Sequence, residues 1–371
     1  MKVRIAIIGS RGYPSTYGGF ETFVRRIAPF LADRGHGVTV YGRSGDAWRR
    51  PTEGSVDGIR TVVTRGIDSK SFSTLRFGCT AAWHARSGGY DAALVMNVAN
   101  GYFLRVLRRA DVPVVVNVDG IEWERAKWNR LAKAVFYRGA SASARNANIL
   151  VADSRAIADY WRSEFGVEAR FIPYGGESSE PDDDAAFRTL GLTERRYVLV
   201  VARLVPENNV DLFLDACDLL APDTEVVVVG SAVGGSSTED RLRILDKSRY
   251  RWLGHVHDQA LLRSLWRHAG VYFHGHSVGG TNPALLQAMG SGAPVVAVNT
   301  VFNREVITPG SGVLVEADAR AIAESLRSVL ADDVFAAALG QGAMKRVADA
   351  YTWDGVCAAY LEALEAAVAG K

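Results

Sequence analysis

Short apolar runs alternate with longer amphipathic stretches along the whole chain. In the first half, such runs predict strands at 3–8, 38–42, 59–64, 92–97, 113–118, 149–153 and 169–174. In the second half they predict strands at 197–203, 225–229, 250–254, 271–274 and 294–298. The runs at 113–118 and 149–153 are apolar almost throughout, which is typical of parallel strands covered by helices on both faces.

The stretches between these runs have helical periodicity. Within 20–31, for example, the apolar residues Phe20, Phe23, Val24, Ile27 and Leu31 fall on one face. Similar patterns predict helices at 210–220, 239–247, 258–268, 283–290 and 319–330. Two successive β/α halves predict an α/β protein of two doubly wound, Rossmann-like domains, at 1–176 and 177–350. The segment 351–371 predicts a last helix with no strand after it.

Composition supports a folded protein that stays in the cytoplasm. The chain has 371 residues, of which 48% are hydrophobic and 23% are charged. Its longest apolar runs are far shorter than the roughly 20 residues of a membrane span. Three well-separated cysteines, Cys79, Cys217 and Cys357, fit a reducing compartment. We therefore expect a cytoplasmic location, with peripheral contact at the inner face of the membrane as an open alternative.

The two halves of the chain differ in charge. Residues 1–176 contain 26 Lys and Arg against 15 Asp and Glu, a net charge of +11, whereas residues 177–371 carry −9. A basic half is expected to meet an anionic partner, although drift in composition between domains would give the same numbers. We expect no nucleic-acid partner. A basic amphipathic stretch after Trp123 fits either an anionic membrane surface or a solvated helix face.

Glycines follow two of the predicted strands at the edge where parallel sheets bind ligands. Gly18 and Gly19 precede the helix at 20–31, which suits either a phosphate or sugar contact or a turn with positive φ. Strand 271–274 is followed by a turn whose backbone N–H groups suit a diphosphate or sugar hydroxyls, formed by Gly279, Gly280, Thr281 and Asn282. Asn282 is the predicted N-cap of the next helix, and Pro283 is its predicted first residue.

Four further residues carry suitable chemistry. Arg203 ends strand 197–203 and is placed to bind phosphate oxygens, or to form a surface ion pair. Asp119 and Glu122 follow strand 113–118 and are candidates for acid/base work or hydroxyl binding. Gln287 lies one turn into the helix at 283–290, within reach of a ligand at the helix start.

Four segments together resemble family 4 of the retaining glycosyltransferases, most closely a bacterial branch that includes rhamnosyltransferases of cell-surface polysaccharide assembly. They are Arg11-Gly12-Tyr13-Pro14 with Gly18-Gly19-Phe20-Glu21, Asp119-Gly120-Ile121-Glu122-Trp123, Arg203-Leu204-Val205-Pro206-Glu207-Asn208-Asn209, and 274–283. The resemblance implies a GT-B fold, with two Rossmann-like domains facing each other across a cleft. It also implies that the last helix packs back on the first domain.

The resemblance implies residue roles as well. A nucleotide diphosphate sugar would bind the second domain, with its diphosphate and sugar held by Arg203, Asn208, Gly279, Gly280, Thr281, Asn282 and Gln287, and faced by Gly18 and Gly19. The first domain would bind the acceptor, whose side we assign to Tyr17, Glu21 and Trp123. Asp119 is the first candidate to stabilise the positive sugar centre, and Glu122 the second. Neither a metal nor a cofactor is expected.

Three departures from the family pattern, at four positions, stand out. Gly279 and Gln287 stand where the family has two glutamates, Asn208 where it has a lysine, and Asp119 where it often has a histidine. A glutamine offers one acceptor and one donor group, which suits the single hydroxyl of a deoxyribose such as that of dTDP, with UDP as the alternative. We expect retaining, metal-independent transfer of a hexosyl group, such as rhamnosyl, to a glycan, lipid-linked or small-molecule acceptor. The alternatives are an inactive sugar-nucleotide-binding homologue and a GT-B epimerase.

Overall fold

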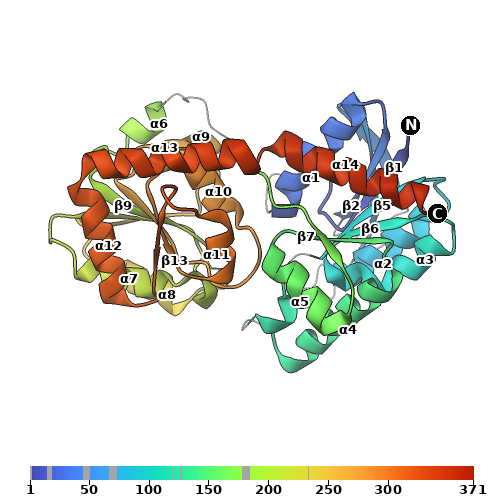
Figure 1. The fold of residues 1–371 in the computed structure, drawn as a ribbon, viewed down its shortest axis with the longest axis horizontal. Coiled ribbons are helices and arrows are strands. Elements are labelled where there is room, and N and C mark those ends of the chain that lie inside the picture. The colour runs from blue at the N-terminus through green and yellow to red at the C-terminus, as the bar shows by residue number, and fades with distance from the viewer. Residues whose placement is uncertain are drawn as a thin grey trace. The chain divides into compact units, whose positions relative to one another are not determined.

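The computed structural model describes residues 2–14, 19–44, 51–66, 73–118, 120–125, 128–177, 184–232 and 234–371. The predicted site residues Tyr17, Gly18 and Asp119 lie outside these ranges. The chain divides into two compact units, one formed by Met1–Tyr174 with Trp353–Lys371 and the other by Gly175–Thr352 (Figure 1). Each unit is an α/β layer structure with its own sheet, as the sequence predicted.

The first unit contains an eight-stranded sheet in the order β3-β4-β2-β1-β5-β6-β7-β8. The strands are β1 Arg4–Ile8, β2 Gly37–Ser44, β3 Thr52–Val56, β4 Ile59–Arg65, β5 Ala92–Met96, β6 Val114–Asn117, β7 Ile149–Ala152 and β8 Ala169–Phe171. All neighbours pair in parallel except β3, which is antiparallel to β4. The strand order reverses direction between β1 and β5.

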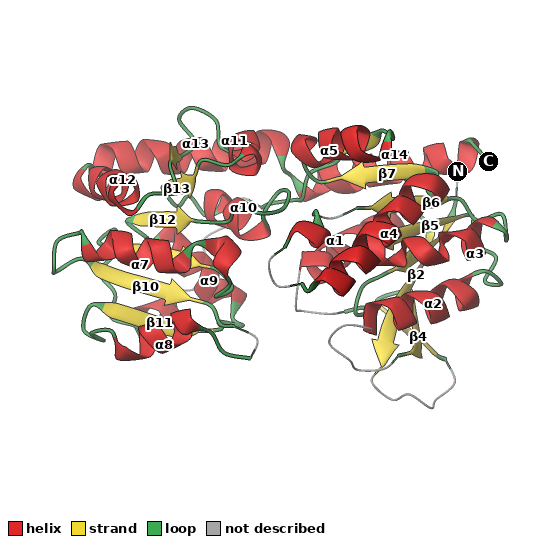
Figure 2. Cartoon of the chain, turned by 90° about the horizontal axis from the view of Figure 1, so that it is seen from below, coloured by secondary structure: helices red, strands yellow, loops and turns green. Residues whose placement is uncertain are grey.

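Helices cover both faces of this sheet (Figure 2). They are α1 Gly19–Asp33, α2 Ser73–Ala85, α3 Leu104–Arg108, α4 Arg130–Asn146, α5 Arg155–Phe165 and α14 Trp353–Ala369. The last helix of the chain, α14, packs with α1 over the sheet in one apolar core. Within that core the rings of Phe23 and Tyr360 are 4.7 Å apart, and the Tyr360 hydroxyl accepts a hydrogen bond from the Asn117 amide at 2.5 Å.

The units change at 174/175 and 352/353, whereas the predicted domain boundaries lie at 176/177 and 350/351. The difference arises because the two crossing segments pair with each other. The Gly176 N–H donates to the Tyr351 carbonyl at 2.6 Å, and Gly176 forms an isolated parallel bridge with Thr352. Gly176, Tyr351 and Thr352 therefore all belong to the second unit.

The second unit contains a six-stranded, wholly parallel sheet in the order β11-β10-β9-β12-β13-β14. The strands are β9 Tyr197–Val201, β10 Glu225–Val229, β11 Tyr250–Gly254, β12 Val271–His274, β13 Val295–Val298 and β14 Val313–Val315. The helices are α6 Ala185–Arg188, α7 Val210–Asp218, α8 Ser237–Ile244, α9 Gln259–Arg267, α10 Pro283–Gly290, α11 Val301–Val306, α12 Ala319–Ala331 and α13 Asp333–Ala350. Its strand order is that of a Rossmann domain.

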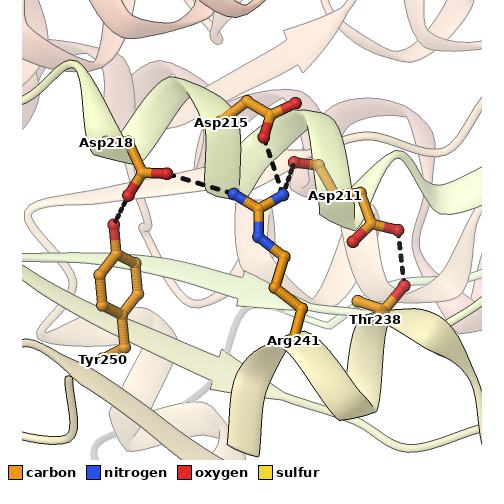
Figure 3. Close-up of polar contacts among 6 residues, drawn as sticks. All are labelled: Asp211, Asp215, Asp218, Thr238, Arg241 and Tyr250. Atoms are coloured by element: carbon orange, nitrogen blue, oxygen red, sulfur yellow. Dashed lines mark hydrogen bonds and ion pairs between the residues drawn. The ribbon is translucent and has the colours of Figure 1, made fainter. Parts of the chain in front are cut away.

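An arginine on α8 ties that helix to α7 (Figure 3). The Arg241 guanidinium donates to the Asp215 carboxylate at 2.8 Å and to the Asp218 carboxylate at 3.2 Å. Asp218 also accepts from the Tyr250 hydroxyl of β11, so one aspartate joins two elements. These contacts hold α8 and β11 against α7, the helix that follows β9.

Each predicted strand overlaps an observed one, but two strands were not predicted. β3 has the sequence Thr-Glu-Gly-Ser-Val and is exposed over most of its length, so it lacks an apolar pattern. It is joined to β4 by Asp57 and Gly58, both with positive φ, which is the conformation of a tight hairpin turn. β14 has only three residues. Within the described part of the chain, no helix is both long enough and apolar enough to span a membrane.

Candidate functional site

The centre of the second sheet is the place where an α/β unit with this strand order is expected to bind a ligand. Strands β9 and β12 are neighbours, with Val198 paired to Val271 and Val200 paired to Phe273. The chain leaves β9 towards α7 and leaves β12 towards α10, and the strand order reverses between the two. In open α/β sheets, ligands bind beyond the carboxyl ends of the strands at such a switch point.

The two loops that leave this point are joined by hydrogen bonds at three successive positions. The Ser277 N–H and hydroxyl both donate to the Glu207 carbonyl at 2.9 Å. His276 Nδ1 lies 2.7 Å from Asn208 Oδ1, and Asn209 Nδ2 donates to the Gly275 carbonyl at 2.7 Å. We call these pairs, 207 with 277, 208 with 276 and 209 with 275, the loop ladder.

The loop ladder requires a glycine at its third position. A Cβ atom on Gly275 would lie 2.3 Å from the Asn208 carbonyl oxygen, much closer than real contacts allow. Asn209 adopts a left-handed conformation with φ of 51°, which asparagine tolerates better than most residues. The ladder therefore makes one continuous platform from two loops that lie far apart in the sequence.

Arg203 is held by its backbone while its side chain reaches solvent. The strand ends at Val201, so Arg203 lies in the loop rather than in the predicted strand. Its carbonyl accepts from the buried Asn208 amide at 2.7 Å and from the Val205 N–H at 2.9 Å. Its guanidinium is exposed and forms no hydrogen bond or ion pair with the described residues. Arg203 is therefore a cation whose backbone is held in place, and its side chain is suited to bind an anionic ligand.

The predicted cap of α10 is confirmed. The Asn282 side chain accepts from the Ala284 N–H at 2.9 Å, and Pro283 is the first helical residue. Gly279 has a φ of 121°, which a side chain would strain, and Thr281 is buried. Gly280 and Gln287 are half-buried, with Gln287 on the second turn of the helix. The glycine turn and the positive N-terminal end of α10 therefore belong to the connection between β12 and α10. The loop ladder joins this connection to the loop that carries Arg203.

His274 closes β12 directly beneath this platform. It is 4% exposed, its Nδ1 lies 3.1 Å from the Tyr272 hydroxyl, and its Nε2 has no hydrogen-bond partner within the described structure. Burial, with a smaller effect of His276, lowers the pKa of His274 to about 3. His274 is therefore neutral at neutral pH.

In the first unit, Glu21 and Gly19 stabilise the start of α1. The buried Glu21 carboxylate accepts from the Arg11 N–H at 3.1 Å, so it holds the segment that directly follows β1. The Gly19 carbonyl accepts from the Tyr174 hydroxyl at 2.9 Å. Glu21, which we expected on the acceptor side, therefore supports the backbone at Arg11.

Glu122 and Trp123 are also engaged with neighbouring side chains. Glu122 is 5% exposed, and its two oxygens lie 3.0 Å from Arg125 Nε and 2.9 Å from Trp128 Nε1. Trp123 is buried, donates to the Tyr160 hydroxyl at 3.1 Å, and packs against Tyr137 and Phe165. Both residues brace the segment that follows β6, which is where Asp119 occurs in the sequence.

Sequence reasoning missed His276. It falls inside a segment that carried the resemblance, but its position gave no sign of a contact with Asn208, 68 residues away. A histidine two residues beyond a strand end, in a glycine-rich turn, was the one available signal.

Two family models together match nearly the whole chain. Residues 18–175 match "Glycosyl transferase 4-like domain", and residues 182–346 match "Glycosyl transferases group 1". A curated relative, "GDP-mannose-dependent monoacylated alpha-(1-6)-phosphatidylinositol monomannoside mannosyltransferase" of Corynebacterium glutamicum, is 28% identical over 214 residues. That alignment covers 52% of this chain and 56% of the relative, so it spans little more than half the length of either protein.

Solved structures show the same fold. The sucrose-phosphate synthase of Thermosynechococcus elongatus is 21% identical, with a TM-score of 0.85 and complete coverage of both chains. Anabaena HepE in complex with UDP-glucose is 16% identical, with a TM-score of 0.76 over 98% of this chain and 100% of its own. An α,α-trehalose-phosphate synthase of Burkholderia vietnamiensis is 15% identical, with a TM-score of 0.77 over 99% of both chains. The predicted GT-B fold is confirmed.

The buried, neutral His274 predicts a specific loss of stability in acid. In the unfolded chain a histidine takes up a proton near pH 6.5, whereas the folded chain resists it down to about pH 3. The free energy of unfolding should therefore fall as pH drops through this window, by up to about 1.4 kcal/mol per pH unit from this residue. Urea denaturation of wild type and His274→Asn between pH 7.5 and 4.5 should show a shallower decline in the variant. Tyr272→Phe, which keeps the imidazole, should retain the wild-type slope, and identical slopes in His274→Asn and wild type would contradict the assignment.

Proposed function

We propose that the chain is a glycosyltransferase of GT-B fold that transfers a hexosyl group from a nucleotide diphosphate sugar to an acceptor hydroxyl. The acceptor is a glycan, a lipid-linked sugar or a small molecule. The transfer retains the configuration at the anomeric carbon and uses no metal. The segments that carry the family resemblance favour a deoxyhexosyl group such as rhamnosyl, transferred in polysaccharide assembly.

The observation that carries this proposal is the platform at the switch point of the second unit. It joins the exposed Arg203 guanidinium to the glycine turn and the capped start of α10 through the loop ladder. A guanidinium and a helix N-terminus both stabilise the negative charge that develops on a leaving diphosphate. The backbone of Arg203 and the start of α10 are held in place before the ligand arrives, so the Arg203 side chain is the part that must order when the ligand binds.

Nucleotide sugars are also named as donors or bound ligands of similar proteins. The Corynebacterium relative is named for its dependence on GDP-mannose, and HepE was solved with UDP-glucose. Both donors carry a hexose on a nucleoside diphosphate, which supports a donor of this class here. The two donors contain different nucleotides, so the nucleotide used here must be inferred from this chain's own residues.

On the acceptor side, Asp119 remains our first candidate for stabilising the positive sugar centre. Glu122 stays second, because its carboxylate is already engaged by Arg125 and Trp128. That engagement supports a positioning role for Glu122 in the segment that leads from Asp119.

A lipid-linked acceptor at an anionic membrane is favoured by one feature of α4. Leu131 is 69% exposed at the start of this helix and stands between the exposed Arg130 and the half-buried Lys133. An exposed leucine beside cations is typical of a surface that contacts anionic lipid. We propose that the enzyme works in the cytoplasm, at the inner face of the membrane.

The function is tested by screening nucleotide sugars for binding and hydrolysis by mass spectrometry. Wild type should bind at least one of UDP-glucose, GDP-mannose and dTDP-rhamnose, and should hydrolyse it slowly without an acceptor. Arg203→Ala should lower donor affinity at least tenfold, because a charge-assisted contact is worth about 1.5–3 kcal/mol. Arg320→Ala, an exposed arginine elsewhere in the same unit, is the matched control and should have no effect.

The same screen separates the alternatives. Binding without any turnover across a broad acceptor panel would identify an inactive homologue, for which Gly279 and Gln287 at the two family glutamate positions are the reason. Interconversion of the nucleotide sugar without an acceptor would identify an epimerase. Asp119→Ala that binds donor and turns over like wild type would remove Asp119 from the mechanism.

The nucleotide is tested at Gln287. We propose dTDP, because a glutamine satisfies one hydroxyl where a glutamate would accept from both hydroxyls of a ribose. Thermal-shift titration of wild type should show tighter binding of dTDP than of UDP, GDP or ADP, by about 1 kcal/mol. Gln287→Glu should shift the preference towards UDP, whereas Gln341→Glu, at an exposed glutamine of α13, should leave it unchanged. Tighter binding of a ribonucleotide by wild type would rule out the dTDP proposal.

A further inference from the structure

We propose that the outer face of α2, α3 and α4 binds the anionic headgroups of a lipid bilayer. The inference rests on the proposed function for its membrane location. It deepens that location by assigning the contact to a surface of three helices and by naming the lipid chemistry that fits it. We call this surface the basic face and define it by nine cations, Arg76, Arg86, Arg105, Arg108, Arg109, Arg130, Lys133, Arg138 and Arg145.

The basic face carries cations and no acids. The stretches 73–86, 98–110 and 128–148 contain all nine cations and neither Asp nor Glu. Eight of the cations are exposed and one is half-buried, and within the described structure none of them forms an ion pair. Acids occur only at the borders of the face, where Asp111 follows α3 and Glu164 of α5 accepts from a tyrosine of α4. A surface of one sign attracts a partner of the opposite sign.

The other face of the same sheet differs in charge. The core beneath α1 and α14 takes Ile5, Ile7 and Leu94 from the strands and, among the described residues, none from α2, α3 or α4. Because successive side chains of a strand point to opposite faces, these three helices cover the other side of the sheet. Helix α14 contains three acids and no Lys or Arg, and α1 contains charges of both signs. Drift in composition would not sort charges by face, so the separation favours an anionic partner.

The three helices form one continuous surface (Figure 2). A Cβ atom on Gly78 of α2 would lie 1.9 Å from Asn100 Oδ1 in the 3₁₀ helix η1 Val98–Phe103, which leads directly into α3. The Tyr102 hydroxyl of η1 donates to the Val135 carbonyl of α4 at 2.7 Å. Helices α2, α3 and α4 are therefore held against one another, and their cations share one support.

Exposed apolar side chains stand among the cations. Leu131, Arg138 and Arg145 are exposed and spaced by seven residues, so they lie on one side of α4. Trp83 of α2 is 50% exposed, and the Arg86 guanidinium lies 4.2 Å from the centre of its ring. Leucine and tryptophan enter the headgroup region of a bilayer, whereas a nucleic acid or another polyanion in solution would leave the leucine in water. The mixture therefore favours a bilayer as the partner.

Charge reversal at equal net charge separates the basic face from the charge of the whole protein. Arg108→Glu with Arg138→Glu replaces two exposed cations of the face. Lys247→Glu with Arg320→Glu replaces two exposed cations of the second unit and is the matched control. Each substitution subtracts two charges, so both double variants change the net charge from +2 to −2. If only net charge mattered, the two variants should lose vesicle binding equally.

The test is co-sedimentation of the full chain with vesicles of phosphatidylcholine, either alone or with added phosphatidylglycerol. Wild type should bind only the anionic vesicles, and less tightly in about 1 M than in about 0.1 M NaCl, because salt screens the attraction. The face variant should bind at least about thirtyfold more weakly, and the control variant close to wild type. Trp83→Ser with Leu131→Ser should also weaken binding, without changing its dependence on salt.

Three outcomes would overturn the inference. They are no preference of wild type for anionic vesicles, equal losses in the two charge variants, and tighter binding to duplex DNA than to the anionic vesicles, which would identify a nucleic-acid partner instead. None of these outcomes bears on donor binding, which the nucleotide-sugar screen with Arg203→Ala measures in the second unit. Failure of that screen would overturn the proposed transferase and leave the basic face standing.

Discussion

The close approach of Gly275 to the Asn208 carbonyl is the contact on which the candidate site depends. Strands β9 and β12 bring their following loops together at the switch point, but only a residue without a Cβ lets the two backbones meet. Once they meet, the three pairs of the loop ladder form, and the ladder fixes both Arg203 and the turn before α10. A larger residue at 275 would push apart the two halves of the proposed diphosphate site.

The platform illustrates how a site can hold negative charge with few formal cations. Arg203 contributes one full charge, and the start of α10 contributes oriented N–H groups. Directly below, His274 stays neutral because it is buried. His274 is enclosed within the sheet, whereas His276, two residues later, lies half-buried in the turn beyond it.

The sequence predicted the parts of this site that depend on local structure. The strands on either side of the switch point and the Asn282–Pro283 start of α10 follow from apolar runs and capping preferences, which act within a few residues. The loop ladder could not be predicted, because Asn208 and His276 are 68 residues apart and meet only through tertiary structure. Glu122 shows the same limit, since the sequence places a carboxylate after β6 but does not reveal that Trp128 bonds to it. The sequence pattern did not predict the polar edge strand β3, because this strand buries almost no side chain.

Hydrogen exchange with mass detection tests most directly whether the two loops form one binding platform. Peptides covering 203–209 and 275–284 should both gain protection when a nucleoside diphosphate such as dTDP is added, and should do so over the same concentration range. Peptides from α12, on the outside of the unit, should not change. Binding of the nucleotide that protects only one of the two loops, or neither, would contradict the account.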